Sequence, residues 1–249
     1  MTSNMYAFFL SLIAGISTLI GFLFIFIKKD RSKIICKALG FASGVMFTIS
    51  IIDLIPNSLS LIIKTYNYIY TALVVLIGFF IGVLISSIID LKVEKASKKG
   101  SKLYKLGIIS MIVIVMHNIP EGIATFMTTT NNLKLGITLA IAITLHNIPE
   151  GISISIPIYY STNSKLKAFI YTLISGLSEP LGALIAYLFL SNIVGDTLLG
   201  ILYSIIAGMM VNISINELYK ESSNYNKRYS FIYFIIGNTI MILNHILFN

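Results

Sequence analysis

Residues 116–124 read "MHNIPEGIA", and the same six-residue core returns at residues 145–153 as "LHNIPEGIS". Each copy places a histidine, an asparagine, a proline and a glutamate inside an otherwise apolar run. Ionisable groups are costly in an apolar environment and usually mark a functional site there. The rest of the sequence shows which environment this is.

The composition is that of a protein embedded in a membrane. Of the 249 residues, 56% are hydrophobic and only 11% are charged, whereas about 25% charged residues is usual for soluble domains. A helix that crosses a bilayer needs roughly 20 apolar residues. Eight runs are long enough, at about 5–27, 35–55, 70–89, 106–128, 134–157, 168–190, 197–218 and 230–247. The first is too long for a cleaved signal peptide. We therefore expect an all-α integral membrane protein in which residues 1–249 form a single transmembrane domain.

The basic residues are divided unequally between the two sides of the predicted membrane. If the eight spans alternate in direction, all but Lys64 and Lys134 of the 18 Lys and Arg residues fall on one side. Loops rich in Lys and Arg stay in the cytoplasm. Both termini are therefore expected on the extracytoplasmic side of a plasma or inner membrane. The basic surface is expected to meet the lipid bilayer at anionic head groups, and not nucleic acid.

The two halves of the chain resemble each other. Residues 43–58, "SGVMFTISIIDLIPNS", and residues 207–222, "AGMMVNISINELYKES", are identical at seven of sixteen positions, and Asp53 aligns with Glu217. Two weaker matches lie at similar separations, between residues 14–21 and 175–182 and between residues 79–85 and 234–240. Each match joins an odd-numbered span to an even-numbered one, so paired helices run in opposite directions. This predicts an inverted repeat of three, two and three helices, an arrangement of transporters in which substrate binds near the midplane.

Half of the ten acidic residues and two of the three histidines lie inside the predicted spans. They are Asp53, Glu121, Glu150, Glu179, Glu217, His117 and His146. No Lys or Arg lies deep in a span to neutralise the carboxylates, so they are either protonated or share a bound cation.

Within each HNIPEG, the histidine and the glutamate are four residues apart and share one face of a helix. Two antiparallel copies would present two imidazoles and two carboxylates to one cation. Asn118 and Asn147 are rotated by about 100° from the histidines and can serve an adjacent site.

Three prolines accompany these polar residues. Pro120, Pro149 and Pro180 each remove a backbone hydrogen bond and are expected to kink their helices beside the site. Pro180 belongs to "SGLSEPLGA" at residues 175–183, whose glycines would allow another helix to approach closely.

Four further residues have two interpretations each. Met46 and Met210 are either packing residues or sulfur ligands. Asp53 and Glu217 lie towards the outer and inner ends of their spans and are either way-stations on a metal pathway or interfacial caps. His245, near the outer end of the last span, is expected at the membrane interface.

HNIPEG in the fourth and fifth spans and "SEPLGA" in the sixth resemble the ZIP (Zrt/Irt-like) metal transporters, with the bacterial ZupT-like branch as the most similar group. The resemblance covers essentially the whole chain. It implies a transport site formed by His117, Glu121, His146 and Glu150, with Met46 as an additional sulfur ligand. It also implies a second site formed by Asn118, Asn147 and Glu179, with both glutamates shared. Unlike many relatives, this chain has no histidine in the loop at residues 91–105.

The expected function is uptake of divalent metal ions into the cytoplasm. Imidazole, carboxylate and amide ligands suit zinc and also iron, manganese and cobalt, and no resident cofactor is implied. An intramembrane metal-dependent hydrolase is the alternative, although the HExxH pattern of zinc proteases is absent. A proton-coupled carrier of organic cations would leave the paired histidines unused. The sequence does not decide between a monomer and a homodimer.

Overall fold

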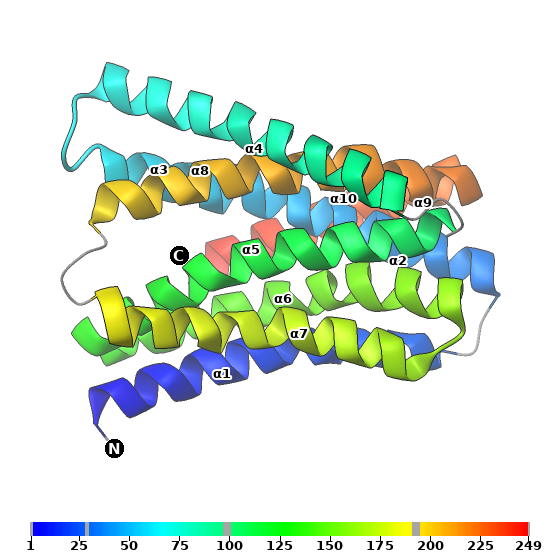
Figure 1. Cartoon of the computed structure of the whole chain (residues 1–249), viewed down its shortest axis with the longest axis horizontal. Coiled ribbons are helices and arrows are strands. Elements are labelled where there is room, and N and C mark those ends of the chain that lie inside the picture. Colours follow the sequence, from blue (N-terminus) through cyan, green and yellow to red (C-terminus); the bar gives the residue numbers. More distant parts are fainter. Residues whose placement is uncertain (1, 28–29, 97–100, 191–194, 249) are drawn as a thin grey trace.

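The computed structural model describes residues 2–27, 30–96, 101–190 and 195–248, which form helices joined by short connections (Figure 1). Among these residues, eight helical segments are long and apolar enough to cross a membrane, the same number as the predicted spans. They are α1 (Ser3–Phe22) with η1 (Leu23–Phe26); α2 (Arg31–Ile49), η2 (Ser50–Leu54) and α3 (Ile55–Ile62); α4 (Tyr68–Ala96); α5 (Lys102–Asn131); α6 (Leu133–Thr162); α7 (Lys165–Ile185) with η3 (Ala186–Leu190); α8 (Asp196–Asn212), η4 (Ile213–Tyr219) and α9 (Lys220–Tyr225); and α10 (Lys227–Phe248).

The helices lie roughly along one axis, and the connections alternate between the two ends of the bundle (Figure 1). The segments η1, α4, α6 and α9 finish at one end of the bundle, and α3, α5 and η3 finish at the other, where α1 begins and α10 ends. In the sequence, the segments that join helices at the first end contain most of the basic residues counted above. Of these, Lys28, Lys29, Lys98 and Lys99 lie outside the described residues.

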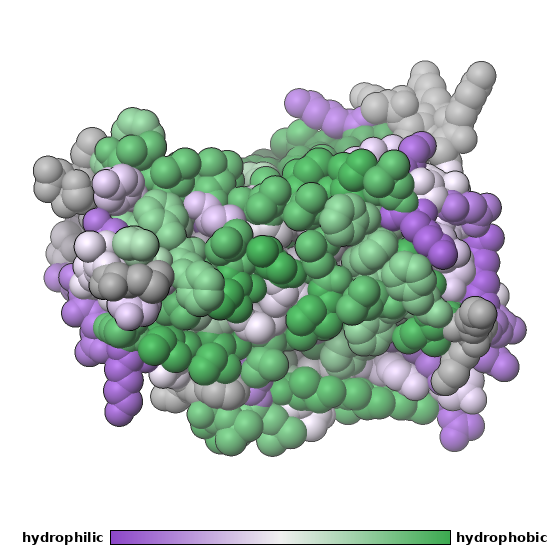
Figure 2. All heavy atoms as spheres, turned by 90° about the horizontal axis from the view of Figure 1, so that it is seen from below, coloured by the Kyte–Doolittle hydropathy of each residue, from purple (hydrophilic) through white to green (hydrophobic). Residues whose placement is uncertain are grey.

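The surface carries a broad apolar band between two polar ends (Figure 2). Large hydrophobic side chains on the outward faces of the helices are exposed, for example Phe80 at 61% and Leu84 at 60%. A soluble protein does not expose so much contiguous apolar surface. The band has the character expected of a surface in contact with lipid.

The spans differ in how deeply they are buried. About two thirds of the α5 span and of the α2–α3 span is buried within the protein, but only 22% of the α4 span and of the α10 span. In the bundle, α1 packs on α6 and α5 packs on α7, while α2 packs on α10 and α4 packs on α8. The central helices are therefore α5 and α6, which carry the HNIPEG segments, together with the spans of α2 and α8.

Several helices extend beyond the predicted limits. The second span was expected to end near residue 55, but it continues through η2 and α3 to Ile62. Pro56 does not stop it because it lies in the first turn of α3, where proline is tolerated. Likewise α5, α6 and α7 are each continuous through their internal prolines. The kinks predicted at these prolines stay a prediction.

Candidate metal centre

The two HNIPEG segments face each other because α5 and α6 form a tight antiparallel hairpin. Asn132 alone connects the two helices, and its side chain accepts a hydrogen bond from the backbone N–H of Leu135 at 3.2 Å. On α5, His117 and Glu121 occupy successive turns of one face, and their Nε2 and Oε1 atoms are 3.1 Å apart. The prediction that they share a face is confirmed.

The histidines and glutamates also meet across the hairpin. The Nε2 atom of His146 lies 3.1 Å from Oε1 of Glu121, and Nε2 of His117 lies 3.4 Å from Oε1 of Glu150. Potential ligand atoms of His117, Glu121 and His146 all lie within 4.8 Å of one another. All four side chains are buried, with exposures of 7% or less. The structure thus brings His117, Glu121 and His146 close enough to share one cation, with Glu150 beside His117.

Glu121 is hydrogen-bonded to His146, but several other polar atoms of this cluster lack a hydrogen-bond partner. Neither carboxylate oxygen of Glu150 has a hydrogen bond within the described part of the chain, nor does Nδ1 of either histidine. The described ion pairs of Lys with acidic residues, Lys64–Asp196 and Lys105–Asp90, lie elsewhere. Buried polar atoms are normally satisfied, and buried charges are normally paired or coordinate a metal. A divalent cation would supply the missing partner.

A second polar group adjoins the cluster on the side of α7. The Asn147 amide donates from Nδ2 to Oε2 of Glu179 at 2.9 Å and to the Ala14 carbonyl at 2.8 Å. The Asn118 amide donates to the Ser175 carbonyl at 3.1 Å. These bonds assign the amide orientations and leave Oδ1 of both asparagines, with Oε1 of Glu179, buried and without a hydrogen bond. Three oxygen atoms are therefore available at the predicted second site.

Met46 and Met210 are fully buried in the apolar core. Met46 lies in α2, which packs on α6, and Met210 lies in α8. Packing alone accounts for both positions. A role for Met46 as a sulfur ligand stays a prediction.

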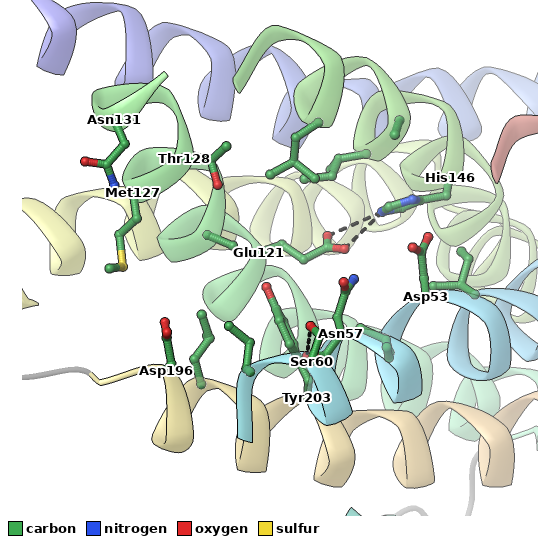
Figure 3. Close-up of a pocket in the computed structure, with 18 of the residues that line it drawn as sticks. Asp53, Asn57, Ser60, Glu121, Met127, Thr128, Asn131, His146, Asp196 and Tyr203 are labelled. Carbon is green, nitrogen blue, oxygen red and sulfur yellow. Dashed lines mark hydrogen bonds and ion pairs between the residues drawn. The ribbon is translucent and has the colours of Figure 1, made fainter. Parts of the chain in front are cut away.

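A cavity of about 420 Å³ leads to the cluster from one end of the bundle (Figure 3). Glu121 and His146 line its inner part, and Lys64, Asn131 and Asp196 line its mouth. At the mouth, Nζ of Lys64 lies 2.9 Å from Oδ2 of Asp196. These mouth residues belong to the end of the bundle opposite the basic connections. The cluster is thus accessible from that end.

Asp53 and Glu217 line cavities at opposite ends of the molecule. Asp53 lies in the π-helical segment η2 and lines the large cavity. Glu217 lies in the π-helical segment η4 and lines a smaller cavity of about 180 Å³, together with Lys102 and Lys105. Asp53 shares its cavity with Glu121 and His146, whereas the residues that line the cavity of Glu217 include none of the cluster. The roles of both carboxylates stay predictions. His245, expected at the interface, has a further contact, because its Nδ1 atom lies 3.4 Å from Oδ1 of Asp53.

Sequence reasoning missed other residues of the large cavity, among them Asn57, Ser60 and Tyr203. The sequence did contain a pattern that could have identified Asn57 and Ser60. Asp53, Asn57 and Ser60 follow one another at intervals of four and three residues, which places them on one helix face. Tyr203 gives no comparable signal, since a single tyrosine in an apolar helix is ordinary.

Comparison with known proteins gave consistent matches. Residues 92–245 match the family described as ZIP Zinc transporter. The chain is 39% identical to the Zinc transporter ZupT of Streptococcus mutans serotype c over 97% of each chain. It is 37% identical to the Zinc transporter ZupT of Clostridium perfringens, over 100% of this chain and 98% of the relative. It is 40% identical to the Zinc transporter ZupT of Campylobacter jejuni, over 96% and 94% respectively.

Proposed function

The chain belongs to the ZIP zinc transporter family, and we propose that it imports divalent transition-metal ions into the cytoplasm through the buried His/Glu cluster between α5 and α6. As a family member it is a multi-pass membrane transporter of divalent metal ions and not an enzyme. The direction of transport, the set of ions and the ligand assignments below are proposals.

The observation that carries the proposal is a buried pair of carboxylates that have only histidines beside them. Glu121 and Glu150 lie beside two histidines, buried and without a Lys or Arg partner among the described residues. A structural ion-pair network would have provided such partners. The cluster also lies at the inner part of a cavity that opens to one end of the bundle, as a transport site must.

We assign two adjacent metal positions to this cluster. His117, His146 and the two glutamates are the ligands of the first, with Met46 as an additional sulfur ligand. Asn118, Asn147 and Glu179 are the ligands of the second, with Glu121 and Glu150 shared. The support is that all of these residues are buried, and that Oδ1 of both asparagines, both carboxylate oxygens of Glu150 and Oε1 of Glu179 have no hydrogen-bond partner in the described part of the chain.

The ligand chemistry favours zinc and neighbouring ions. Imidazole with carboxylate suits Zn²⁺, Fe²⁺, Mn²⁺ and Co²⁺, whereas Cu⁺ prefers sulfur. Calcium and magnesium prefer sites built from oxygen alone. The metal ion is the transported substrate.

The packing supports an inverted repeat of three, two and three helices. The repeat aligns the span of α1 with that of α7, and α5 with α6. If each helix is replaced by its partner in the repeat, the contact of α1 with α6 becomes the contact of α7 with α5, and both contacts are present. In the same way, the contact of α2 with α10 becomes that of α8 with α4.

The closest contacts between helices show the same symmetry. A Cβ atom on Gly15 would overlap the carbonyl oxygen of Gly176, and a Cβ atom on Gly176 would overlap that of Gly15. Gly122 makes the same kind of contact with the Glu179 carbonyl as Gly151 makes with that of Thr18. In both cases the partners are aligned by the repeat.

We propose that the large cavity opens to the extracytoplasmic side. The support is that its mouth lies opposite the connections that contain most of the Lys and Arg residues, and such loops stay in the cytoplasm. Both termini are then extracytoplasmic, and residues 1–249 form one transporter domain in a plasma or inner membrane. Asp53 in the outer cavity and Glu217 in the inner one would act as relays, and movement of the central helices would alternate access between them.

Flux and stoichiometry test the proposal. Proteoliposomes containing a metal-sensitive dye should show Zn²⁺ influx, and a panel with Fe²⁺, Mn²⁺, Co²⁺ and Ca²⁺ should rank Ca²⁺ last. Metal analysis of the purified protein should find two Zn²⁺ per chain, falling to one in Asn147→Ala. Retention of two ions in that variant would contradict the second position. Hydrolysis of a peptide or lipid without any flux would favour the alternative of an intramembrane hydrolase.

A further inference from the structure

Asp53 and His245 form a contact between two spans that are far apart in the sequence. Oδ1 of Asp53 lies 3.4 Å from Nδ1 of His245, across the interface between the second span and α10. Both side chains are partly exposed, Asp53 at 21% and His245 at 32%. Asp53 lines the cavity that contains Glu121 and His146, and His245 adjoins it through this contact. A carboxylate and an imidazole at this distance offer one oxygen and one nitrogen ligand.

The pair lies on the route to the central cluster. Asp53 lines the same cavity as Glu121 and His146, and Figure 3 shows its carboxylate beside His146 and directed into the cavity. Asp53 interacts electrostatically with both His146 and His245. It therefore stands between an imidazole of the central cluster and an imidazole of α10.

The local backbone also sets Asp53 apart. It lies in η2, the π-helical segment that interrupts the second span. Such segments are rare and occur frequently at functional sites. Glu217, aligned with Asp53 by the repeat, likewise lies in a π-helical segment, η4.

The repeat provides a second, independent observation. The same alignment that matches residues 79–85 with 234–240 places His245 opposite Asp90. Asp90 and Glu217 are two carboxylates that repel each other, and Asp90 forms an ion pair with Lys105 at 2.7 Å. The repeat thus places potential metal ligands at equivalent positions at the two ends, while the attractive carboxylate–imidazole contact is that of Asp53 with His245.

We infer that Asp53 and His245 form a separate metal site that captures a hydrated divalent transition-metal ion in the outer cavity and delivers it to His146 and Glu121. This inference rests on the proposed function. Two protein ligands leave the other coordination positions to water, so the ion is held weakly and can leave, as transport requires. The imidazole favours zinc-like ions over Ca²⁺ and Mg²⁺, which prefer oxygen ligands. The site therefore acts as a first selection step.

Uptake kinetics in proteoliposomes test this role. Asp53→Asn and His245→Gln should each raise the KM for Zn²⁺ about tenfold, the effect typical of removing a metal-supporting group, and leave the maximal rate within about twofold. Asp53→Glu keeps a carboxylate and should restore most of the loss. Asp196→Asn is the matched control, because it removes the same charge at the mouth of the same cavity. An unchanged KM in both variants, or an equal rise in Asp196→Asn, would overturn the site.

Selectivity gives a second readout that a structural role of His245 would not produce. His245→Asp replaces the pair with two carboxylates, which suit hard cations. Millimolar Ca²⁺ outside should then inhibit Zn²⁺ uptake strongly in this variant and weakly in the wild type. Equal Ca²⁺ inhibition in the two proteins would contradict the selection step.

Binding experiments separate this site from the transport proposal. In a Glu121→Gln, Glu150→Gln background, calorimetry with Zn²⁺ alone should still detect one weak site, which disappears when His245→Gln is added. No residual binding in the background would overturn the inference. If the wild type shows no flux, the proposed function fails, but the calorimetry still decides whether the Asp53–His245 site exists.

Discussion

Glu150 offers a test in which two explanations of the cluster predict different effects of one substitution on the stability of the metal-free protein. It is fully buried, neither of its oxygens has a hydrogen bond among the described residues, and its contact with Nε2 of His117 is 3.4 Å long. If Glu150 is a metal ligand, Glu150→Gln removes a buried carboxylate whose charge is compensated only when the ion is bound. If instead it forms a structural ion pair with protonated His117, the substitution removes half of a buried pair.

The two explanations differ for the metal-free protein. Removing one member of a buried ion pair costs about 3–5 kcal/mol. Removing a carboxylate that has no hydrogen-bond partner sacrifices no such interaction, so the metal-free variant should unfold at the wild-type temperature or above it. The measurement is thermal unfolding of the purified protein in detergent with a chelator present.

If Glu150 is a metal ligand, Zn²⁺ should also stabilise the Glu150→Gln variant much less than the wild type. At a Zn²⁺ concentration of about 100 times its Kd, the wild type gains about 2.7 kcal/mol of stability from binding. Groups that merely support a ligand change affinity by about 10–100-fold, so we expect a loss of about a hundredfold for the ligand itself. The same Zn²⁺ concentration then stabilises Glu150→Gln by only about 0.4 kcal/mol.

Glu221→Gln is the matched control. It makes the same chemical change on α9, where the carboxylate accepts a hydrogen bond from Asn224 at 3.0 Å, and should keep the stabilisation by Zn²⁺. Two results would refute the reasoning: a Glu150→Gln protein that Zn²⁺ stabilises as strongly as the wild type, or a metal-free variant destabilised by several kcal/mol.

Two further predictions concern pH and packing. Zn²⁺ affinity should fall as pH decreases, because protons compete with the metal for imidazoles and carboxylates. Measurements of Zn²⁺ uptake from pH 7.5 to 5.5 should show the KM rising, and a constant KM would argue against histidine ligands. Gly122→Ala should destabilise the protein by about 1–3 kcal/mol, because the new methyl group would overlap the Glu179 carbonyl oxygen and push α7 away from α5. Gly195→Ala, with no atom within 4 Å of the added Cβ, should leave the unfolding temperature unchanged, and equal effects of the two substitutions would contradict the close contact.

Much of the architecture could be predicted because a bilayer imposes simple rules on sequence. Apolar length predicted the eight spans, and the four-residue spacing of His117 and Glu121 predicted a shared face. The antiparallel direction of α5 and α6 followed from their position as consecutive spans. Together these rules were enough to expect His146 and Glu150 opposite them, where the structure places them.

Other features depend on contacts that a linear pattern does not contain. The helix ends were underestimated because hydropathy reports the hydrocarbon layer, while α3 and α9 continue into the more polar region beyond it. The outer cavity arises from the packing of α3, α5, α6 and α8, so its mouth at Lys64 and Asp196 had no sequence signal.

The central claim is that the facing His/Glu pairs of α5 and α6 form the transport site. The most direct test is Zn²⁺ influx into proteoliposomes loaded with a metal-sensitive dye, comparing the wild type with His117→Ala combined with Glu121→Ala. We predict rapid, saturable influx for the wild type and none above the empty-liposome rate for the double variant, with both proteins reconstituted in equal amounts. Influx by the double variant at the wild-type rate would contradict the claim.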